Sequence, residues 1–204
     1  MTSAAVFSAI AFVAAFFVGA IPFGVLVSRA FYGTDLRRSG SGNIGAANAL
    51  RTLGKRGAVA VLALDALKGF APVLAAAALA GPAAATAAAL GAVIGHCWSP
   101  FLAFKGGKGV ATFLGAVIAL WWPSGIAFGI VWVAAVLACG YASVGSMLAS
   151  LAMAPVLWFG LGPLGLAYGL LAALLIVYRH GENLGRLRRG TENRFSLLKA
   201  PRQS

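Results

Sequence analysis

Residues 109–178 read GVATFLGAVIALWWPSGIAFGIVWVAAVLACGYASVGSMLASLAMAPVLWFGLGPLGLAYGLLAALLIVY and contain no Asp, Glu, Lys or Arg. A charge-free run of this length is typical of membrane-spanning segments, since about 20 apolar residues cross the hydrocarbon core of a bilayer. Breaks at Pro123–Gly125, Cys139–Ser143 and Gly160–Pro163 divide the run into four predicted spans. Several of these are shorter than a straight crossing needs, so bent or partial spans are expected.

The composition of the whole chain supports the same class. Hydrophobic residues make up 61% and charged residues 10%, with a mean hydropathy of +0.91, which is outside the range of soluble globular proteins. The net charge is +12, but the basic residues lie in short segments between apolar runs. That placement fits a membrane surface or a phosphorylated substrate better than nucleic acid, and we expect no nucleic-acid partner. The two cysteines and the four dispersed acidic residues form no metal-binding pattern, so we expect neither a metal nor a cofactor.

The first half of the chain adds three predicted spans. Met1 to about Ser28 is apolar, and residues 58–104 are apolar except for Asp65 and Lys68, with a break at Gly81-Pro82. Asp65 and Lys68 are three residues apart on one helix face, and we interpret them as a structural ion pair, with proximity to a site as the lesser alternative.

Together these segments predict an all-α integral membrane protein. Residues 1–204 should form a single polytopic domain of about seven transmembrane helices, with the N-terminus outside and the C-terminus in the cytoplasm. Most of the basic residues fall in three polar segments, 29–57, 95–112 and 179–195. Because positive charge marks the cytoplasmic side, these segments should meet on one membrane face, where they could form one site.

The middle polar segment contains Lys105 and Lys108 among Gly106, Gly107 and Gly109. Glycines let backbone N–H groups approach a phosphate closely, and a helix beginning near residue 110 would add its positive end. The alternative is an ordinary cytoplasmic loop whose lysines set topology. That alternative does not explain the glycines, so we favour an anion site.

In the first polar segment, Gly and Ser cluster before an alanine-rich run that predicts a short helix ending at Gly54. Either Ser41 or Asn43 should be its N-cap, while Asn48 and Arg51 share a face of the helix. A capped interfacial helix with a topology-setting arginine is the alternative interpretation.

The third polar segment carries His180, Asn183 and Arg186 at three-residue spacing, followed by Gly190 and Glu192. An imidazole is suited to proton transfer near neutral pH, and an amide beside it can orient a hydroxyl group. By itself, His180 is better interpreted as a polar anchor at the end of a span, and only Asn183 and Arg186 on the same face make a role in proton transfer an equally good interpretation.

These three motifs resemble those of the PlsY family, the bacterial membrane glycerol-3-phosphate acyltransferases that use acyl phosphate as donor. The matching motifs are Ser41 to Asn48 with Arg51, Gly95 to Thr112, and His180-x-x-Asn183-x-x-Arg186 with Gly190 and Glu192. Ala47 departs from the threonine that is common there, which puts one hydroxyl contact in doubt. The resemblance covers the whole chain.

The resemblance implies that an acyl group passes from acyl phosphate to the 1-hydroxyl of glycerol 3-phosphate, giving lysophosphatidic acid and phosphate. It also implies a place in the bacterial inner membrane, contact with membrane lipid, and a partnership with the soluble enzyme that makes acyl phosphate. A membrane transporter of an anionic phosphorylated metabolite is the alternative. A transporter should carry polar groups near the midplane, and apart from Asp65 and Lys68 the polar residues lie at one face.

By the same resemblance, two sets of residues belong to the site. The catalytic set is Ser41, Arg51, Lys108, His180 and Asn183. The substrate-binding set is Gly42, Asn43, Gly45, Asn48, His96, Lys105, Gly106, Gly107, Gly109, Thr112 and Arg186. Either His180 or a phosphate of the substrate could act as the base.

Overall fold

The computed structural model describes residues 3–195, which contain helices and no β-strand. The α-helices are α1 (Ser3–Ala20), α2 (Phe23–Tyr32), α3 (Ala46–Thr52), α4 (Gly54–Cys97), α5 (Val110–Leu120), α6 (Pro123–Cys139), α7 (Ala142–Arg179) and α8 (Gly181–Arg188). Two short 3-10 helices, η1 (Leu36–Arg38) and η2 (Pro100–Leu102), lie in the connections. The predicted all-α class is confirmed.

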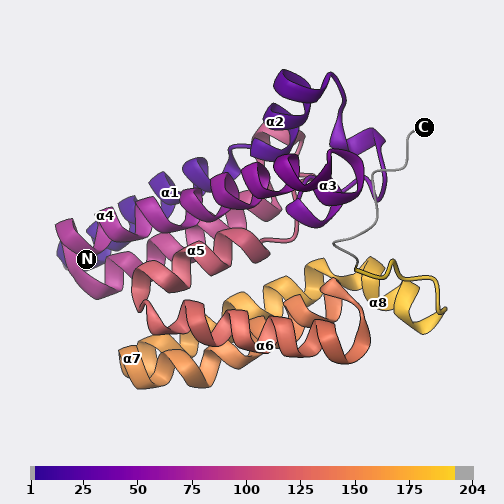
Figure 1. The fold of residues 1–204 in the computed structure, drawn as a ribbon. Helices are drawn as coiled ribbons and strands as arrows, with labels where there is room; N and C mark the ends of the chain where they lie inside the picture. The colour runs from indigo at the N-terminus through magenta and orange to yellow at the C-terminus, as the bar shows by residue number, and fades with distance from the viewer. Residues whose placement is uncertain (1–2, 196–204) are drawn as a thin grey trace.

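The helices form two layers that meet along their length. Helices α1, α4 and α5 pack side by side in one layer, and α6 pairs with α7 in the other (Figure 1). The shorter helices α2, α3 and α8 gather at one end of both layers, away from the N-terminus (Figure 1). Segments from the first, middle and last parts of the sequence are therefore brought to the same end of the molecule.

Both long helices turn back on themselves at a glycine. Gly81 in α4 has φ 80° and Gly162 in α7 has φ 60°, and a proline follows each of them. A left-handed φ favours glycine, and the proline cannot continue the preceding helix. The breaks predicted at these two positions are confirmed, as are those before α6 and after its last residue, Cys139.

The predicted first span, which the apolar stretch of residues 3–32 supports, contains a break. Helix α1 ends at Ala20, and α2 begins at Phe23 after a break at Ile21 and Pro22. Pro22 has no backbone N–H to continue α1, so the chain turns there. In the sequence Pro22 lies within an otherwise apolar run, which gives no sign of the break.

Three helical stretches are long and apolar enough to cross a membrane: residues 3–32, 54–102 and 142–179. Helices α5 and α6 are shorter, at 11 and 17 residues. The membrane class agrees with the prediction. The number of crossings and the sides of the two termini stay predictions.

Small residues allow the helices of the first layer to touch backbone to backbone. A Cβ on Gly91 or Gly95 of α4 would collide with carbonyl oxygens of Phe12 and Phe16 in α1. A Cβ on Gly115 of α5 would likewise collide with the Ala66 carbonyl of α4. Close approach through small residues is a main source of helix association in lipid, where apolar side chains gain little by leaving an apolar solvent.

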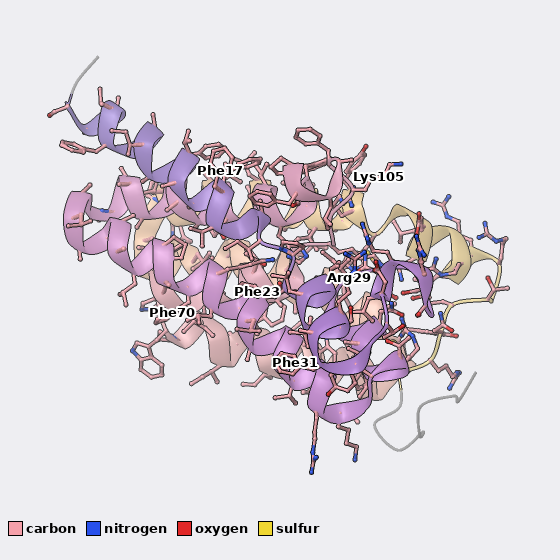
Figure 2. The ribbon with its side chains drawn as sticks, turned by 90° about the horizontal axis from the view of Figure 1, so that it is seen from above. Phe17, Phe23, Arg29, Phe31, Phe70 and Lys105 are labelled. Carbon is pink, nitrogen blue, oxygen red and sulfur yellow. The ribbon has the colours of Figure 1, made fainter. Side chains whose placement is uncertain are left out.

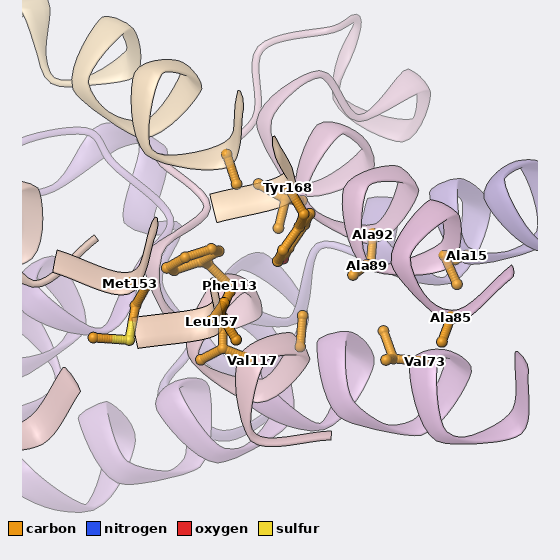
Figure 3. Packing of buried hydrophobic residues seen from close by; sticks show 14 of the residues in the cluster. Ala15, Val73, Ala85, Ala89, Ala92, Phe113, Val117, Met153, Leu157 and Tyr168 are labelled. Atoms are coloured by element: carbon orange, nitrogen blue, oxygen red, sulfur yellow. The ribbon is translucent and has the colours of Figure 1, made fainter. Parts of the chain in front are cut away.

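Larger apolar side chains join the two layers. The ring of Phe113 in α5 lies 5.8 Å from Tyr168 in α7 and 6.2 Å from Phe128 in α6, measured between ring centroids. Met153 and Leu157 of α7 pack beside Phe113 and Val117 of α5 (Figure 3). This core holds the layers together in the apolar part of the molecule and leaves the other end to polar side chains.

Candidate active site

Polar side chains gather at the end of the molecule that holds Arg29 and Lys105, while Phe17 and Phe70 lie on its apolar part (Figure 2). A cavity of about 510 Å³ lies at this polar end. Its lining includes these predicted site residues: Ser41, Asn43, Gly45, Asn48, Arg51, His96, Lys108, Gly109, His180, Asn183 and Arg186. All three predicted motifs thus contribute to one cavity.

Five other predicted site residues are outside that lining: Gly42, Lys105, Gly106, Gly107 and Thr112. Lys105 is exposed, and Thr112 is fully buried in α5, where its hydroxyl has no hydrogen-bond partner among residues 3–195. Gly42 has φ 70° and forms part of the turn before α3. The structure therefore separates residues that face the cavity from residues that shape the loops around it.

Asn48 organises the first polar segment. Its side chain is buried and donates to the carbonyls of Leu36, Ser39 and Asn43 at 3.1, 2.9 and 2.8 Å. Its Oδ1 accepts from the Ser41 backbone N–H at 2.9 Å. These bonds use the Nδ2 donors and one lone pair of Oδ1, so the side chain of Asn48 fixes the loop.

The predicted cap of the short helix is wrong. Gly45 is the N-cap of α3, and no side chain caps the helix. The Asn43 side chain instead accepts from the Gly45 N–H at 3.0 Å, and the helix ends at Thr52, just before Gly54. Ser41 is left free of the helix end, so its hydroxyl is available to Arg51, whose Nη2 donates to it at 3.1 Å.

The glycine-rich loop differs from the expected phosphate cradle at two positions. The N–H of Gly106 donates to the Cys97 carbonyl at 3.2 Å, and that of Gly107 donates to the His96 carbonyl at 3.0 Å. A Cβ on Gly107 would collide with the His96 ring. Gly106 and Gly107 therefore allow close packing, and their backbone N–H groups already donate to carbonyls of the protein. We therefore leave Gly106 and Gly107 out of the proposed phosphate contacts.

Gly109 retains the expected geometry. It has φ 83°, precedes α5 as its N-cap and lies on the cavity wall. The first N–H groups of a helix point out of its N-terminus, where the helix dipole is positive. The start of α5 therefore faces the cavity with a partial positive charge beside Lys108.

A chain of hydrogen bonds connects Lys108 to the third polar segment. Its Nζ donates to Asn183 Oδ1, and Asn183 Nδ2 donates to Glu192 Oε1 at 2.6 Å. Glu192 also accepts from Ser143 at 2.9 Å and from Arg186 Nε at 2.7 Å. Glu192 thus holds two residues of the predicted stripe in place.

Burial changes the protonation of the site. It lowers the pKa of Lys108 to about 8, and the nearby Arg186 charge acts in the same direction. Burial also lowers the pKa of His180 to about 4, against the hydrogen bond between its Nδ1 and the Ile176 carbonyl at 2.7 Å. His180 is therefore neutral at pH 7. Because the carbonyl can only accept, Nδ1 carries the proton and Nε2 is an acceptor.

Sequence reasoning missed three contributors to the site. Glu192 was quoted within a motif but given no role, although it is one of only four acidic residues in the chain. Ser143 carried no signal in the sequence. Arg179 was counted only for topology, yet its guanidinium donates to the carbonyls of Gly106 and Gly107 at 3.0 and 3.1 Å and lies over the Trp98 ring.

The cavity also has an apolar arm. Leu62 of α4, Leu114 of α5, and Phe128 and Val133 of α6 line it. An apolar chain can lie along these side chains while a charged head group stays with the basic residues. Within the described residues, 3–195, no group of three or more His, Cys, Asp or Glu side chains could hold a metal ion.

Comparisons with known proteins identify the family of this chain. The sequence model of the family described as glycerol-3-phosphate acyltransferase matches residues 9–190. This chain belongs to the glycerol-3-phosphate acyltransferase family. A family member from Bradyrhizobium sp. (strain BTAi1) is 44% identical over 95% of this chain and 98% of its own. One from Dinoroseobacter shibae is 45% identical over 98% of both chains.

Solved structures of the glycerol-3-phosphate acyltransferase family have the same fold. The chain is similar to a crystal structure of PlsY, an integral membrane glycerol 3-phosphate acyltransferase, in its glycerol 3-phosphate form, with a TM-score of 0.87 and 39% identity. That match covers 94% of this chain and 96% of the other. The lysophosphatidic acid form of PlsY matches with a TM-score of 0.85 and 38% identity. The predicted family is confirmed, and membership favours an acyltransferase over a transporter.

Proposed function

We propose that the protein transfers a fatty acyl group from acyl phosphate to the 1-hydroxyl of glycerol 3-phosphate, giving lysophosphatidic acid and inorganic phosphate. The observation that carries the proposal is the single cavity in which Arg51, Lys108 and Arg186 meet an apolar arm. Two anionic substrates need several positive groups, and the acyl chain of one of them needs an apolar surface.

Arg51 and Lys108 have the chemistry to bind phosphoryl oxygens. A guanidinium can hold two oxygens at once, and an ammonium offers a compact charge. Placed in a partly buried cavity, both would stabilise the charge that develops as the anhydride bond breaks. Ser41, which Arg51 contacts, and Asn183, which Lys108 contacts, would orient the reacting groups.

In the proposed reaction, the glycerol 3-phosphate hydroxyl oxygen forms a bond to the acyl carbonyl carbon. The bond between that carbon and the phosphate oxygen breaks, and the hydroxyl proton passes to a base. A phosphate with a second pKa of about 6 is a stronger base than an imidazole with a pKa of about 4. We therefore assign the proton of the attacking hydroxyl to a substrate phosphate, and His180 Nε2 is left to accept a hydrogen bond from the other hydroxyl of glycerol 3-phosphate.

The proposal includes the cell surface at which the reaction takes place. The three polar segments carry most of the basic residues and lie at one end of the molecule, which the positive-inside rule assigns to the cytoplasm. We place the enzyme in the bacterial inner membrane, with the cavity facing the cytoplasm. There it could receive glycerol 3-phosphate from water and acyl phosphate from the soluble enzyme that makes it.

Purified protein tests the proposal directly. With acyl phosphate and labelled glycerol 3-phosphate, we expect lysophosphatidic acid to form, equally well when a chelator is present, because none of the proposed roles uses a metal. Acyl-CoA in place of acyl phosphate should give little product. Full activity with acyl-CoA, loss of activity in the chelator, or no product from acyl phosphate would each contradict the proposal.

A further inference from the structure

The ion pair of Asp65 and Lys68, inside the layer of α1, α4 and α5, belongs to a cluster whose third member is His96. Lys68 Nζ lies 2.7 Å from Asp65 Oδ1, and His96 Nδ1 lies 3.7 Å from the same oxygen. All three side chains are at most 3% exposed. They come from the two arms of α4 on either side of Gly81, so the turn in the helix brings them together.

This cluster is costly for a membrane protein to keep. Charges inside a bilayer are expensive, and a buried ion pair is often no more stable than well-packed apolar residues of the same volume. The His96 Nδ1 atom, moreover, has no hydrogen-bond partner in the described chain. Packing alone therefore gives no reason for these three residues, and none of them has a step in the proposed reaction.

The position of the cluster indicates its role. Asp65 and His96 both lie on the cavity wall. Lys68 donates to the Ile21 carbonyl at 2.8 Å, which fixes the break between α1 and α2. On its other side the His96 ring packs on Gly107, whose N–H is bonded to the His96 carbonyl. Gly107 is the residue before Lys108.

We propose that Asp65 and Lys68 are positioning residues that set the place of the Lys108 ammonium through the His96 ring and the Gly107 peptide. The His96 ring lies between the ion pair and the loop: its Nδ1 is 3.7 Å from Asp65 Oδ1, and its Nε2 edge packs against Gly107, whose carbonyl accepts from Arg179. Only the expected effect of this positioning on catalysis rests on the proposed function. The position of Lys108 itself is a property of the folded protein and can be measured without substrate.

The variant for the test is Asp65→Asn combined with Lys68→Met, which removes both charges together and leaves no lone charge in the helix. Competitive acylation of lysines at a series of pH values, read by mass spectrometry on the peptide containing Lys108, reports the environment of its Nζ. In the parent protein the midpoint should lie near the pKa of about 8 that burial gives it. In the double variant we expect a shift of about one pH unit or more towards the ordinary lysine value of about 10.4.

The activity assay supplies the second measurement. We expect kcat of the double variant to fall by about tenfold or more. Adding His96→Asn should then cause little further loss, because both changes interrupt the same path. The matched control is Thr86→Val, which removes another buried hydrogen bond of α4, from Thr86 to the Pro82 carbonyl at 2.8 Å, near the far end of the helix. This control should leave the Lys108 midpoint and kcat unchanged.

A folded double variant with an unchanged Lys108 midpoint would overturn the proposal. The proposal would also be overturned if His96→Asn lowered kcat in the double variant by the same factor as in the parent protein, because the two changes would then act independently. If the double variant does not fold, His96→Asn alone decides, since it keeps the ion pair and removes only the ring: the midpoint must shift in that protein too. A parent protein that shows the expected midpoint but makes no lysophosphatidic acid would contradict the proposed function and leave the positioning result standing.

Discussion

Arg51 and Arg186 lie on the wall of the same cavity but are held in different ways. Arg51 donates to one neutral partner, the Ser41 hydroxyl, and has no ion pair among residues 3–195. Arg186 is paired with Glu192 at 2.7 Å, and that carboxylate is tied to Asn183 and Ser143 as well. An arginine with an internal carboxylate partner has its charge already balanced. Arg51 has no carboxylate bonded to it among residues 3–195, so its guanidinium can still bind an anionic ligand.

The sharpest test of this difference is to replace each arginine by lysine. For Arg51→Lys we expect kcat/KM to fall by about 100-fold or more, because an ammonium cannot hold two phosphate oxygens in the geometry of a guanidinium. For Arg186→Lys we expect a loss of about tenfold or less, since lysine can keep the pairing with Glu192. The measurement is kcat/KM of purified variants at equal folded concentration. Near-normal activity of a correctly oriented Arg51→Lys protein would remove Arg51 from the catalytic set.

Removing the Glu192 carboxylate should destabilise the part of the site around Arg186 more than the part around Arg51. Glu192→Gln takes a charged acceptor from Asn183, Arg186 and Ser143, and we expect it to lower the free energy of unfolding by about 1–3 kcal/mol. Glu182→Gln is the matched control, because Glu182 also lies near Arg186, at 3.8 Å, but is 82% exposed. This substitution should leave the free energy of unfolding almost unchanged. Equal thermal shifts for the two variants would show that Glu192 does not organise this part of the site.

The smallest expected effect is on pH dependence. Burial holds the pKa of folded His180 near 4, below the value of about 6.5 expected for the unfolded chain. Between these values the unfolded state binds more protons, so stability should fall as the pH is lowered through this window. From pH 6 to pH 5 we expect a loss of about 1 kcal/mol, or about 2 to 4 °C in the melting temperature.

The control for that experiment is His180→Gln, which cannot be protonated and should give a flatter profile between pH 7 and 5. This window lies above the range in which Glu192 titrates, since the hydrogen bonds from Asn183 and Arg186 outweigh burial and hold its pKa below the usual value. The same slope in the parent and in His180→Gln would show that another group dominates.

Periodicity and composition were sufficient for the helical class and for most of the breaks. Gly81 and Gly162 could be found from sequence because a glycine followed by a proline is a strong local signal. The break at Pro22 was missed because a lone proline in an apolar run also occurs inside membrane helices, as Pro72 and Pro155 do here. Local signals of this kind identify a turn only when two of them coincide.

The motifs indicated which residues meet at the site but not what each one touches. The spacing of His180, Asn183 and Arg186 predicted one face, and all three line the cavity. Spacing could not show that Asn48 is consumed by backbone carbonyls, nor that Gly107 packs on the ring of His96, because both contacts depend on how distant segments fold together. Ser143 was invisible for the same reason, since its partner is 49 residues away.

The order of the three polar segments along the chain has a consequence for synthesis. Arg51 and Lys108 are made early, whereas His180, Asn183 and Glu192 follow α7, the last of the long helices. A growing chain that has not yet produced this last segment lacks the partner of Lys108 and one wall of the cavity. The proposed site is therefore completed only after α7 has been made, and a chain that stops before residue 180 would lack the proposed contact of Lys108 with Asn183.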